Sequence, residues 1–244
     1  MEETDYNLEV VQSEEISSAC VSIPNITFPK YYKDQSSKQI ITMDWMEGIH
    51  LSEFTETNTN QEKAHRLGQA LWDFYMFQIH KLKKVHADPH PGNFLVSKDT
   101  ELIALDFGCM KAIPEDFYTP YFELADQATL SDQKRFEKKM YELEILLETD
   151  TKEELAFFSD MFHEMLSIFT KPMHAETFDF SDVTFFGEIS EFGERYARNT
   201  ELRQYNASRG SKHFIYMNRT FFGLYNLMFD LKAKDIKINN FLNL

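Results

Sequence analysis

Most of the chain spaces its apolar residues as amphipathic α-helices do. Residues 1–16 set apolar side chains among acidic ones, which predicts a short helix there. A longer helix is predicted over residues 60–84, because Thr59 and Glu62 have the spacing of a capping box. The inner face predicted for this second helix consists of Ala64, Leu67, Leu71, Phe74, Gln78 and Leu82.

Two stretches have the pattern of β-structure. Residues 39–46 are rich in β-branched and bulky side chains, which predicts a mostly buried strand that ends at Gly48. Residues 94–96 and 102–105 are apolar and flank the polar segment 97–101, which predicts a hairpin. A hairpin brings the residues before its first strand and those after its second strand to the same end of the sheet.

The chain from residue 115 onward is predicted to be helical. Thr151 and Glu154 form another capping box, and the Phe and Met stripes around it are interpreted as core. Between residues 171 and 195 the sequence has six Asp or Glu and no Lys or Arg, whereas residues 195–219 have six Lys or Arg and one Glu. This segregation favours a solvated face or an internal pairing of the two segments over a docking patch for an anion or an acidic membrane.

The composition is that of a folded globular protein. Of 244 residues, 43% are hydrophobic and 15% aromatic, which excludes a disordered chain and fits one large domain or two small ones. The net charge of −15 argues against a protein that binds nucleic acid through its phosphates. Cys20 and Cys109 lack the spacing of a disulfide scaffold or a zinc ribbon, no apolar run is long enough to span a membrane, and no secretory leader follows Met1. We therefore expect a soluble, cytoplasmic protein.

Polar residues with the chemistry of phosphoryl transfer stand at both ends of the predicted hairpin. Residues 86–93 read His-Ala-Asp-Pro-His-Pro-Gly-Asn, and Asp-Phe-Gly follows at residues 106–108. Phosphoryl transfer needs a carboxylate that orients the attacking hydroxyl, a role that suits Asp88, and oxygen ligands for magnesium, which Asn93 and Asp106 can supply. His, Asp and Asn in this spacing, followed by Asp-Phe-Gly, match the catalytic core of protein kinases.

The same loop contains residues that could ligate zinc. The candidates are His86, Asp88 and His90. Pro89 and Pro91 deny them a shared helix face and no cysteine lies nearby, so the spacing favours the kinase-like interpretation. We interpret the two histidines mainly as residues that shape the loop.

On these residues the chain resembles the UbiB/AarF family of atypical protein-kinase-like proteins. Residues 86–93 are similar to that family's catalytic loop, whereas ordinary protein kinases carry Arg just before the catalytic Asp. Glu-Thr-Asp-Tyr at residues 3–6, followed by Glu9, resembles a family segment, and residues 41–48 resemble its hinge. Residues 219–225, Arg-Thr-Phe-Phe-Gly-Leu-Tyr, resemble a signature of its terminal helices.

The resemblance implies a role for each matched residue. Asp88 would be the catalytic aspartate, and Asn93 and Asp106 would bind magnesium beside ATP. Glu3 would be the ion-pair glutamate of the regulatory helix, with an exposed first-turn acid as the alternative, and Glu9 would be an additional acidic residue of that helix. The residues whose hinge backbone would face adenine are Asp44, Trp45 and Met46.

The implied fold class is α+β: a protein-kinase-like fold, mostly the helical large lobe, with a catalytic hairpin and a truncated small lobe. Residues 1–45 would be a remnant of the small lobe, with the regulatory helix and the hinge strand, and residues 46–244 would be the large lobe. The family's alanine-rich nucleotide loop, its phosphate-binding Lys and an upstream Lys-x-Gly-Gln segment have no counterpart in this sequence. We therefore expect the chain alone to be at most weakly active, whether as a piece of a split gene, a half completed by a separate small-lobe chain, or a remnant that binds without turnover.

The function that the resemblance implies is magnesium-dependent ATP binding with kinase or ATPase chemistry, in isoprenoid-quinone (ubiquinone) biosynthesis or lipid homeostasis. One alternative is a non-catalytic, pseudokinase-type regulatory module, and another is a small-molecule kinase of the choline or aminoglycoside type. The expected partners are a nucleotide, a small-lobe chain or quinone-biosynthesis proteins, and a membrane contacted peripherally at its inner face, but not nucleic acid.

Overall fold

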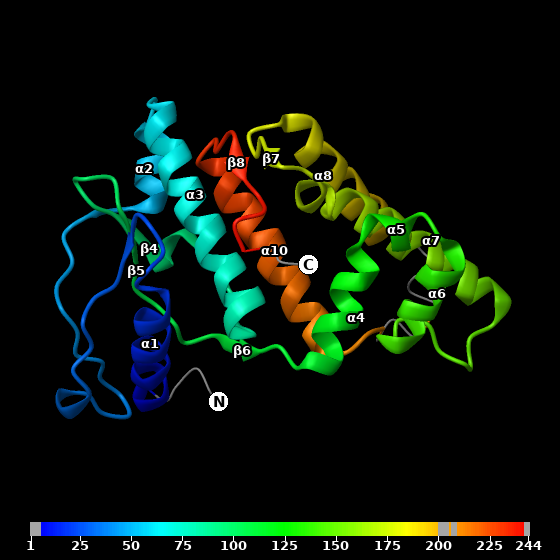
Figure 1. Cartoon of the computed structure of the whole chain (residues 1–244), viewed down its shortest axis with the longest axis horizontal. Helices are drawn as coiled ribbons and strands as arrows, with labels where there is room; N and C mark the ends of the chain where they lie inside the picture. Colours follow the sequence, from blue (N-terminus) through cyan, green and yellow to red (C-terminus); the bar gives the residue numbers. More distant parts are fainter. Residues whose placement is uncertain (1–5, 200–204, 206–208, 242–244) are drawn as a thin grey trace. The chain divides into compact units, whose positions relative to one another are not determined.

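The computed structural model describes residues 6–199, 205 and 209–241, and these form two compact units (Figure 1). Unit 1 comprises the described residues within 1–112, 177–181 and 219–244, and unit 2 comprises those within 113–176 and 182–218. Both sides of the predicted lobe boundary at residues 45 and 46 lie in unit 1, and that boundary stays a prediction.

A four-stranded sheet in unit 1 contains the predicted hairpin. Its strand order is β1-β5-β4-β2, with β4 and β5 antiparallel and Leu95 opposite Ile103. All residues of β4 and β5 are buried, and the hairpin prediction is confirmed. The strands are β1 (Ile26–Thr27), β2 (Ile49–His50), β4 (Phe94–Val96) and β5 (Leu102–Ala104).

The chain on either side of the hairpin forms a second, two-stranded sheet. Strand β3 (Lys84–His86) precedes residues 87–93, and β6 (Met110–Ala112) follows the Asp-Phe-Gly segment at residues 106–108. The two strands pair in antiparallel fashion, with His86 opposite Met110. The chain therefore leaves and re-enters this region at adjacent positions, and both polar segments are attached to the same short sheet.

The predicted N-terminal helix is present as α1 (Tyr6–Cys20). Its buried face includes Val10, Ile16 and Cys20, and Lys84 of β3 forms an ion pair with Glu15 at 2.6 Å. The prediction ended this helix at residue 16, but buried Cys20 shows that the apolar face continues for another turn.

The predicted long helix is α3 (Gln61–Phe77), which follows α2 (Leu51–Thr57) and continues into the π-helical turn η3 (Gln78–Leu82). The predicted capping box with Thr59 is wrong: the Asn60 side chain accepts the Lys63 N–H at 3.1 Å. Asn is at least as good an N-cap as Thr, and with the backbone of Asn60 extended its side-chain Oδ1 reaches that N–H.

Residues 232–240 form a segment, here called the C-terminal strap, that is bound along α3 by side chains of α3. Gln61 donates to the Lys232 carbonyl at 3.0 Å, and Trp72 Nε1 donates to the Ile238 carbonyl at 3.1 Å. A Cβ on Gly68 would lie 2.5 Å from the Ala233 Cβ, so α3 and the strap touch. Within the strap, β8 (Ile236–Lys237) pairs with β7 (Thr177–Phe178). The other α3 residues that bind the strap are His65, Gln69 and Asp73.

The predicted buried strand over residues 39–46 is wrong. The structure has only isolated bridges there, between Tyr31 and Met43 and between Ser37 and Ile40. Trp45 is 91% exposed. The segment folds back on residues 30–37 instead of joining a sheet, so its apolar side chains gain no second layer to pack against.

Unit 2 is helical, as predicted. The capping box of α7 is confirmed, because the Thr151 N–H donates to Glu154 Oε2 at 2.9 Å and the Glu154 N–H donates to Thr151 Oγ1 at 3.2 Å. α10 begins in unit 2 and continues into unit 1 from Arg219. The helices are α4 (Glu115–Ala125), α5 (Gln127–Leu130), α6 (Gln133–Glu142), α7 (Lys152–Phe169), η5 (Lys171–His174), α8 (Val183–Ala197) and α10 (Lys212–Asp230).

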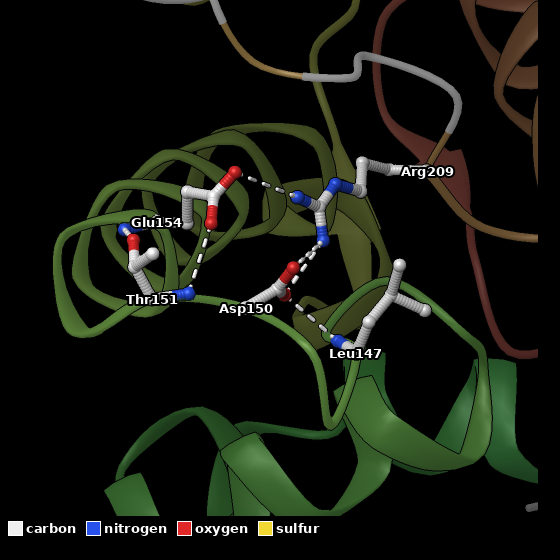
Figure 2. Close-up of polar contacts among 5 residues, drawn as sticks. All are labelled: Leu147, Asp150, Thr151, Glu154 and Arg209. Carbon is white, nitrogen blue, oxygen red and sulfur yellow. Dashed lines mark hydrogen bonds and ion pairs between the residues drawn. The ribbon is translucent and has the colours of Figure 1, made fainter.

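Two arginines of unit 2, Arg195 and Arg209, form internal ion pairs. Arg195 binds Glu164 through two hydrogen bonds of 2.7 and 3.0 Å. Arg209 has a side chain only 5% exposed and binds both carboxylate oxygens of Asp150, whose side chain is 3% exposed (Figure 2). The predicted pairing of the two charged segments is found for Arg198, which binds Glu194. The acids bound by Arg195 and Arg209 lie outside residues 171–195.

Buried His80 is expected to make the stability of the chain depend on pH. Its side chain lies in η3, where burial, helped by Lys83 and Lys81, lowers its pKa to about 4. The unfolded chain takes up a proton below about pH 6.5 and the folded chain does not, so stability is lost as the pH falls below 6.5. Between pH 7 and pH 5, His80 should lower the free energy of unfolding by about 2 kcal/mol.

Urea unfolding at both pH values measures this effect. The His80→Phe variant should lose about 2 kcal/mol less than the parent between pH 7 and pH 5. His50→Phe is the control, because His50 is exposed and its side chain forms no cap bond with α2. An equal pH response in His80→Phe and the parent would contradict the prediction.

Candidate functional site

The two polar segments at the ends of the hairpin are held together by main-chain hydrogen bonds. The Ala87 N–H donates to the Cys109 carbonyl at 2.9 Å, and the Leu105 N–H donates to the Asn93 carbonyl at 3.0 Å. Residues 87–93, which end in the short helix η4 (Pro91–Asn93), thus lie against residues 105–109.

One cleft of about 650 Å³ brings together the three residues predicted for phosphoryl transfer. Asp88, Asn93 and Asp106 all line it. Further residues of its lining come from α1, from the segment before Asp44, from the end of β3 and from the stretch after Asp106. They are Tyr6, Glu9, Gln39, Ile40, Ile41, His86, Gly108 and Cys109. The cleft is therefore polar where the catalytic loop and the Asp-Phe-Gly segment meet.

Asp88 is half-buried and bonded through both its main chain and its side chain. Its carbonyl accepts a hydrogen bond from Asn93 Nδ2 at 3.1 Å, which commits the amide nitrogen and makes the amide oxygen of Asn93 the available ligand. Its carboxylate oxygen Oδ1 accepts a hydrogen bond from Arg219 Nη2 at 2.8 Å.

Asp106 is exposed to the cleft and held by the turn that follows it. Its Oδ1 accepts the Gly108 N–H at 2.7 Å. Phe107, only 1% exposed, points the other way and packs against Phe28, Phe74 and His86, with ring centroids 6.1 to 6.3 Å apart. The buried ring fixes the backbone from which the carboxylate projects.

Glu9 of α1 brings a second carboxyl group to Asp106. Partial burial, together with the charge of Asp106 and a hydrogen bond to it, raises the pKa of Glu9 to about 7. Two carboxyl groups in contact repel each other when both are ionised, and a divalent cation relieves that repulsion. Carboxylate and amide oxygens are also the ligands that magnesium prefers, so Asp106, Asn93 and Glu9 fit a magnesium site.

The two histidines of the loop contribute to its shape. His86 is 3% exposed, and its main-chain N–H donates to Gln78 Oε1 at 3.0 Å. Burial lowers the pKa of the His86 side chain, although the charges of Asp106 and Asp88 act to raise it. His90 Nδ1 accepts the Gly92 N–H at 3.1 Å. In the described part of the chain, no three His, Cys, Asp or Glu side chains are arranged to hold a metal ion by themselves.

One of the residues that resemble the hinge, Ile41, lines the cleft. Gln39, Ile40 and Ile41 line the cleft, whereas Asp44 accepts a hydrogen bond from the Tyr32 hydroxyl at 2.8 Å. The assignment of Asp44, Trp45 and Met46 to adenine therefore stays a prediction. Glu3 lies outside the described residues.

Two contacts of the site have no local sequence signal. Arg219 is 131 residues from Asp88, and the motif around it resembles a family signature without indicating a partner. Glu9 was assigned to the regulatory helix, but its proximity to Asp106 depends on how α1 packs. The available clue was the spacing of Arg219 and Gly223, which are four residues apart and so lie on one face of a helix. A glycine on a helix face indicates close packing there, but it does not identify the partner.

The chain is similar in sequence to known atypical kinase-like proteins. The family model of the ABC1 atypical kinase-like domain matches residues 1–140. The chain is 30% identical to AarF domain-containing protein kinase 1 of Xenopus laevis over 138 residues, which are 54% of this chain and 26% of that protein. It is 27% identical to the mitochondrial atypical kinase COQ8 of Saccharomyces cerevisiae over 186 residues, which are 75% of this chain and 36% of that protein.

A solved structure has a similar fold. The structure of Rv3197 from Mycobacterium tuberculosis in complex with erythromycin matches 99% of this chain and 58% of its own, with a TM-score of 0.73 and 18% identity. The chain spans about a quarter to a third of the length of the two curated relatives.

Proposed function

Because this chain belongs to the family of ABC1 atypical kinase-like domains, we propose that its cleft binds Mg-ATP and supports phosphoryl transfer or ATP hydrolysis. The UbiB/AarF resemblance and the protein-kinase-like fold class predicted from the motifs are confirmed. The observation that carries the proposal is that Asp88, Asn93 and Asp106 line one cleft.

Each residue has a defined task in the proposed chemistry. Asp88 takes the proton that the acceptor hydroxyl or water loses as its oxygen bonds the γ-phosphorus and ADP departs. Asn93 and Asp106 hold magnesium, with Glu9 as a further carboxyl group beside Asp106. When bound, the ion neutralises charge on the phosphate oxygens.

The wider role is proposed from the family resemblance. We propose a role in isoprenoid-quinone biosynthesis or lipid homeostasis, with a separate small-lobe chain or quinone-biosynthesis proteins as partners. Adenine would bind along the hinge backbone at Asp44, Trp45 and Met46, and Glu3 would form the ion pair of the regulatory helix. Among the described helices, none has the length and apolar character that crossing a membrane requires. The peripheral membrane contact is proposed from the family resemblance alone.

Cys109 makes nucleotide binding measurable without an added label site. The chain has two cysteines: Cys109 is half-buried and lines the cleft, whereas Cys20 is buried and burial raises its thiol pKa to about 12. A thiol reagent should therefore modify Cys109 first. At a Mg-ATP concentration about ten times its Kd, the modification rate of Cys109 should fall about tenfold.

A charge-matched pair of variants tests the site. Asp106→Asn should abolish the protection by Mg-ATP, because it removes a charged magnesium ligand and keeps the shape of the side chain. Asp99→Asn should retain it, because exposed Asp99 lies in the hairpin turn at the other end of β4 and β5. Protection that is absent in the parent, or equal in both variants, would contradict the proposal. Protection without ATP turnover would favour the pseudokinase-type regulatory alternative.

A further inference from the structure

α10 packs directly on the catalytic loop. A Cβ on Gly223 would lie 3.0 Å from the Pro89 carbonyl oxygen and 3.1 Å from the Pro89 Cβ and Cδ. Only a residue without a side chain permits this approach without a shift of the helix or the loop. The position of α10 along this part of the loop is therefore fixed by Gly223.

Arg219 stands one helical turn before Gly223, on the same face of α10. The close contact at Pro89 consequently directs the Arg219 side chain onto the preceding residue of the loop, and Nη2 lies 2.8 Å from Asp88 Oδ1. Residues 86–93 contain no Lys or Arg, so α10 supplies a cation that the loop itself lacks.

The pair is too exposed to be explained by stability. The Arg219 side chain is 63% exposed and that of Asp88 is 46% exposed. Ion pairs with this exposure contribute little to folding, because water screens both charges. The contact instead fixes one oxygen of a carboxylate that the proposed reaction needs in a defined orientation, because general-base catalysis depends on that geometry.

We propose that Arg219 is a positioning residue: it holds Asp88 Oδ1 so that the second carboxylate oxygen faces the acceptor hydroxyl. This inference rests on the proposed function of Asp88. The guanidinium suits the task, because it keeps its charge at every physiological pH and its planar N–H donors have fixed directions.

Steady-state ATP turnover by the full chain separates positioning from binding. Arg219→Gln should lower kcat about 10- to 100-fold and leave the KM for ATP within about twofold, because the carboxylate loses its orientation while the magnesium ligands remain. Arg219→Lys should restore part of kcat. Arg195→Gln is the matched control, since it removes an exposed arginine from an ion pair in unit 2 and should leave both constants unchanged.

A second readout does not depend on turnover. The side-chain carboxyl ¹³C signal of Asp88, assigned with Asp88→Asn, should move and broaden in Arg219→Gln and stay as in the parent in Arg195→Gln. If the parent shows no turnover, the catalytic part of the proposed function fails, Mg-ATP binding is still judged by the protection of Cys109, and the Asp88 signal alone decides whether Arg219 positions Asp88. An unchanged Asp88 signal, a kcat equal to that of the parent, or a loss confined to the KM for ATP would overturn the inference.

Discussion

Replacing Arg209 by methionine is expected to lower the free energy of unfolding by about 3–5 kcal/mol. Arg209 binds both oxygens of Asp150, at 2.6 and 2.7 Å, lies 3.8 Å from Glu154 and covers the Phe158 ring at 4.0 Å. Methionine preserves much of the packing but leaves the carboxylate of Asp150 buried without its cation (Figure 2). The cost of that uncompensated charge dominates the effect.

Urea unfolding followed by circular dichroism measures this loss, because unit 2 is mainly helical. Arg198→Met is the control: Arg198 pairs with Glu194 on the surface, where its side chain is 81% exposed, and the expected loss is about 0–1 kcal/mol. The double variant Arg209→Met with Asp150→Ala should lose less than the two single variants added together. A loss below about 1 kcal/mol in Arg209→Met would mean that the pair is not buried in solution.

Replacing Trp72 by alanine is expected to destabilise the chain by about 3–5 kcal/mol as well. Trp72 is fully buried, its ring lies 5.4 Å from that of Phe180, and its Nε1 donates to the Ile238 carbonyl at 3.1 Å. Alanine would leave a cavity between α3 and the C-terminal strap and an unpaired carbonyl in it. The strap should therefore become accessible to protease before the rest of unit 1.

The second tryptophan of the chain is the matched control for the first. Trp45 is 91% exposed, so Trp45→Ala should change the free energy of unfolding by no more than about 0.5 kcal/mol. The two variants remove the same side chain from opposite environments. Equal losses in both would contradict the burial of Trp72 against the strap.

Features that depend on local spacing were predictable from the sequence. The hairpin of β4 and β5 and the capping box of α7 each depend on residues within about ten positions of one another, and both are confirmed. The motif residues Asp88, Asn93 and Asp106 meet in one cleft for the same reason, since the hairpin that joins them is short.

Features that depend on distant partners were not predictable. The apolar pattern of residues 39–46 fits a buried strand and fits equally a segment that no other layer covers. In the structure these residues form a segment without a covering layer. The bond from Arg219 to Asp88 and the bonds from α3 to the strap join residues more than 130 positions apart. The spacing of apolar residues along the sequence does not indicate such pairings, because they depend on how the helices and strands pack against one another.

The C-terminal strap has a consequence for biosynthesis. During translation, α3 is synthesised well before residues 219–241. The residues of unit 2 are synthesised in between and form a compact unit of their own. The apolar side of α3 around Trp72 must stay uncovered through that interval, which is the stage at which nascent chains recruit chaperones or aggregate. Translation speed across the intervening hundred or so codons should thus affect the yield of native protein more than it does for a chain that folds strictly from its N-terminus.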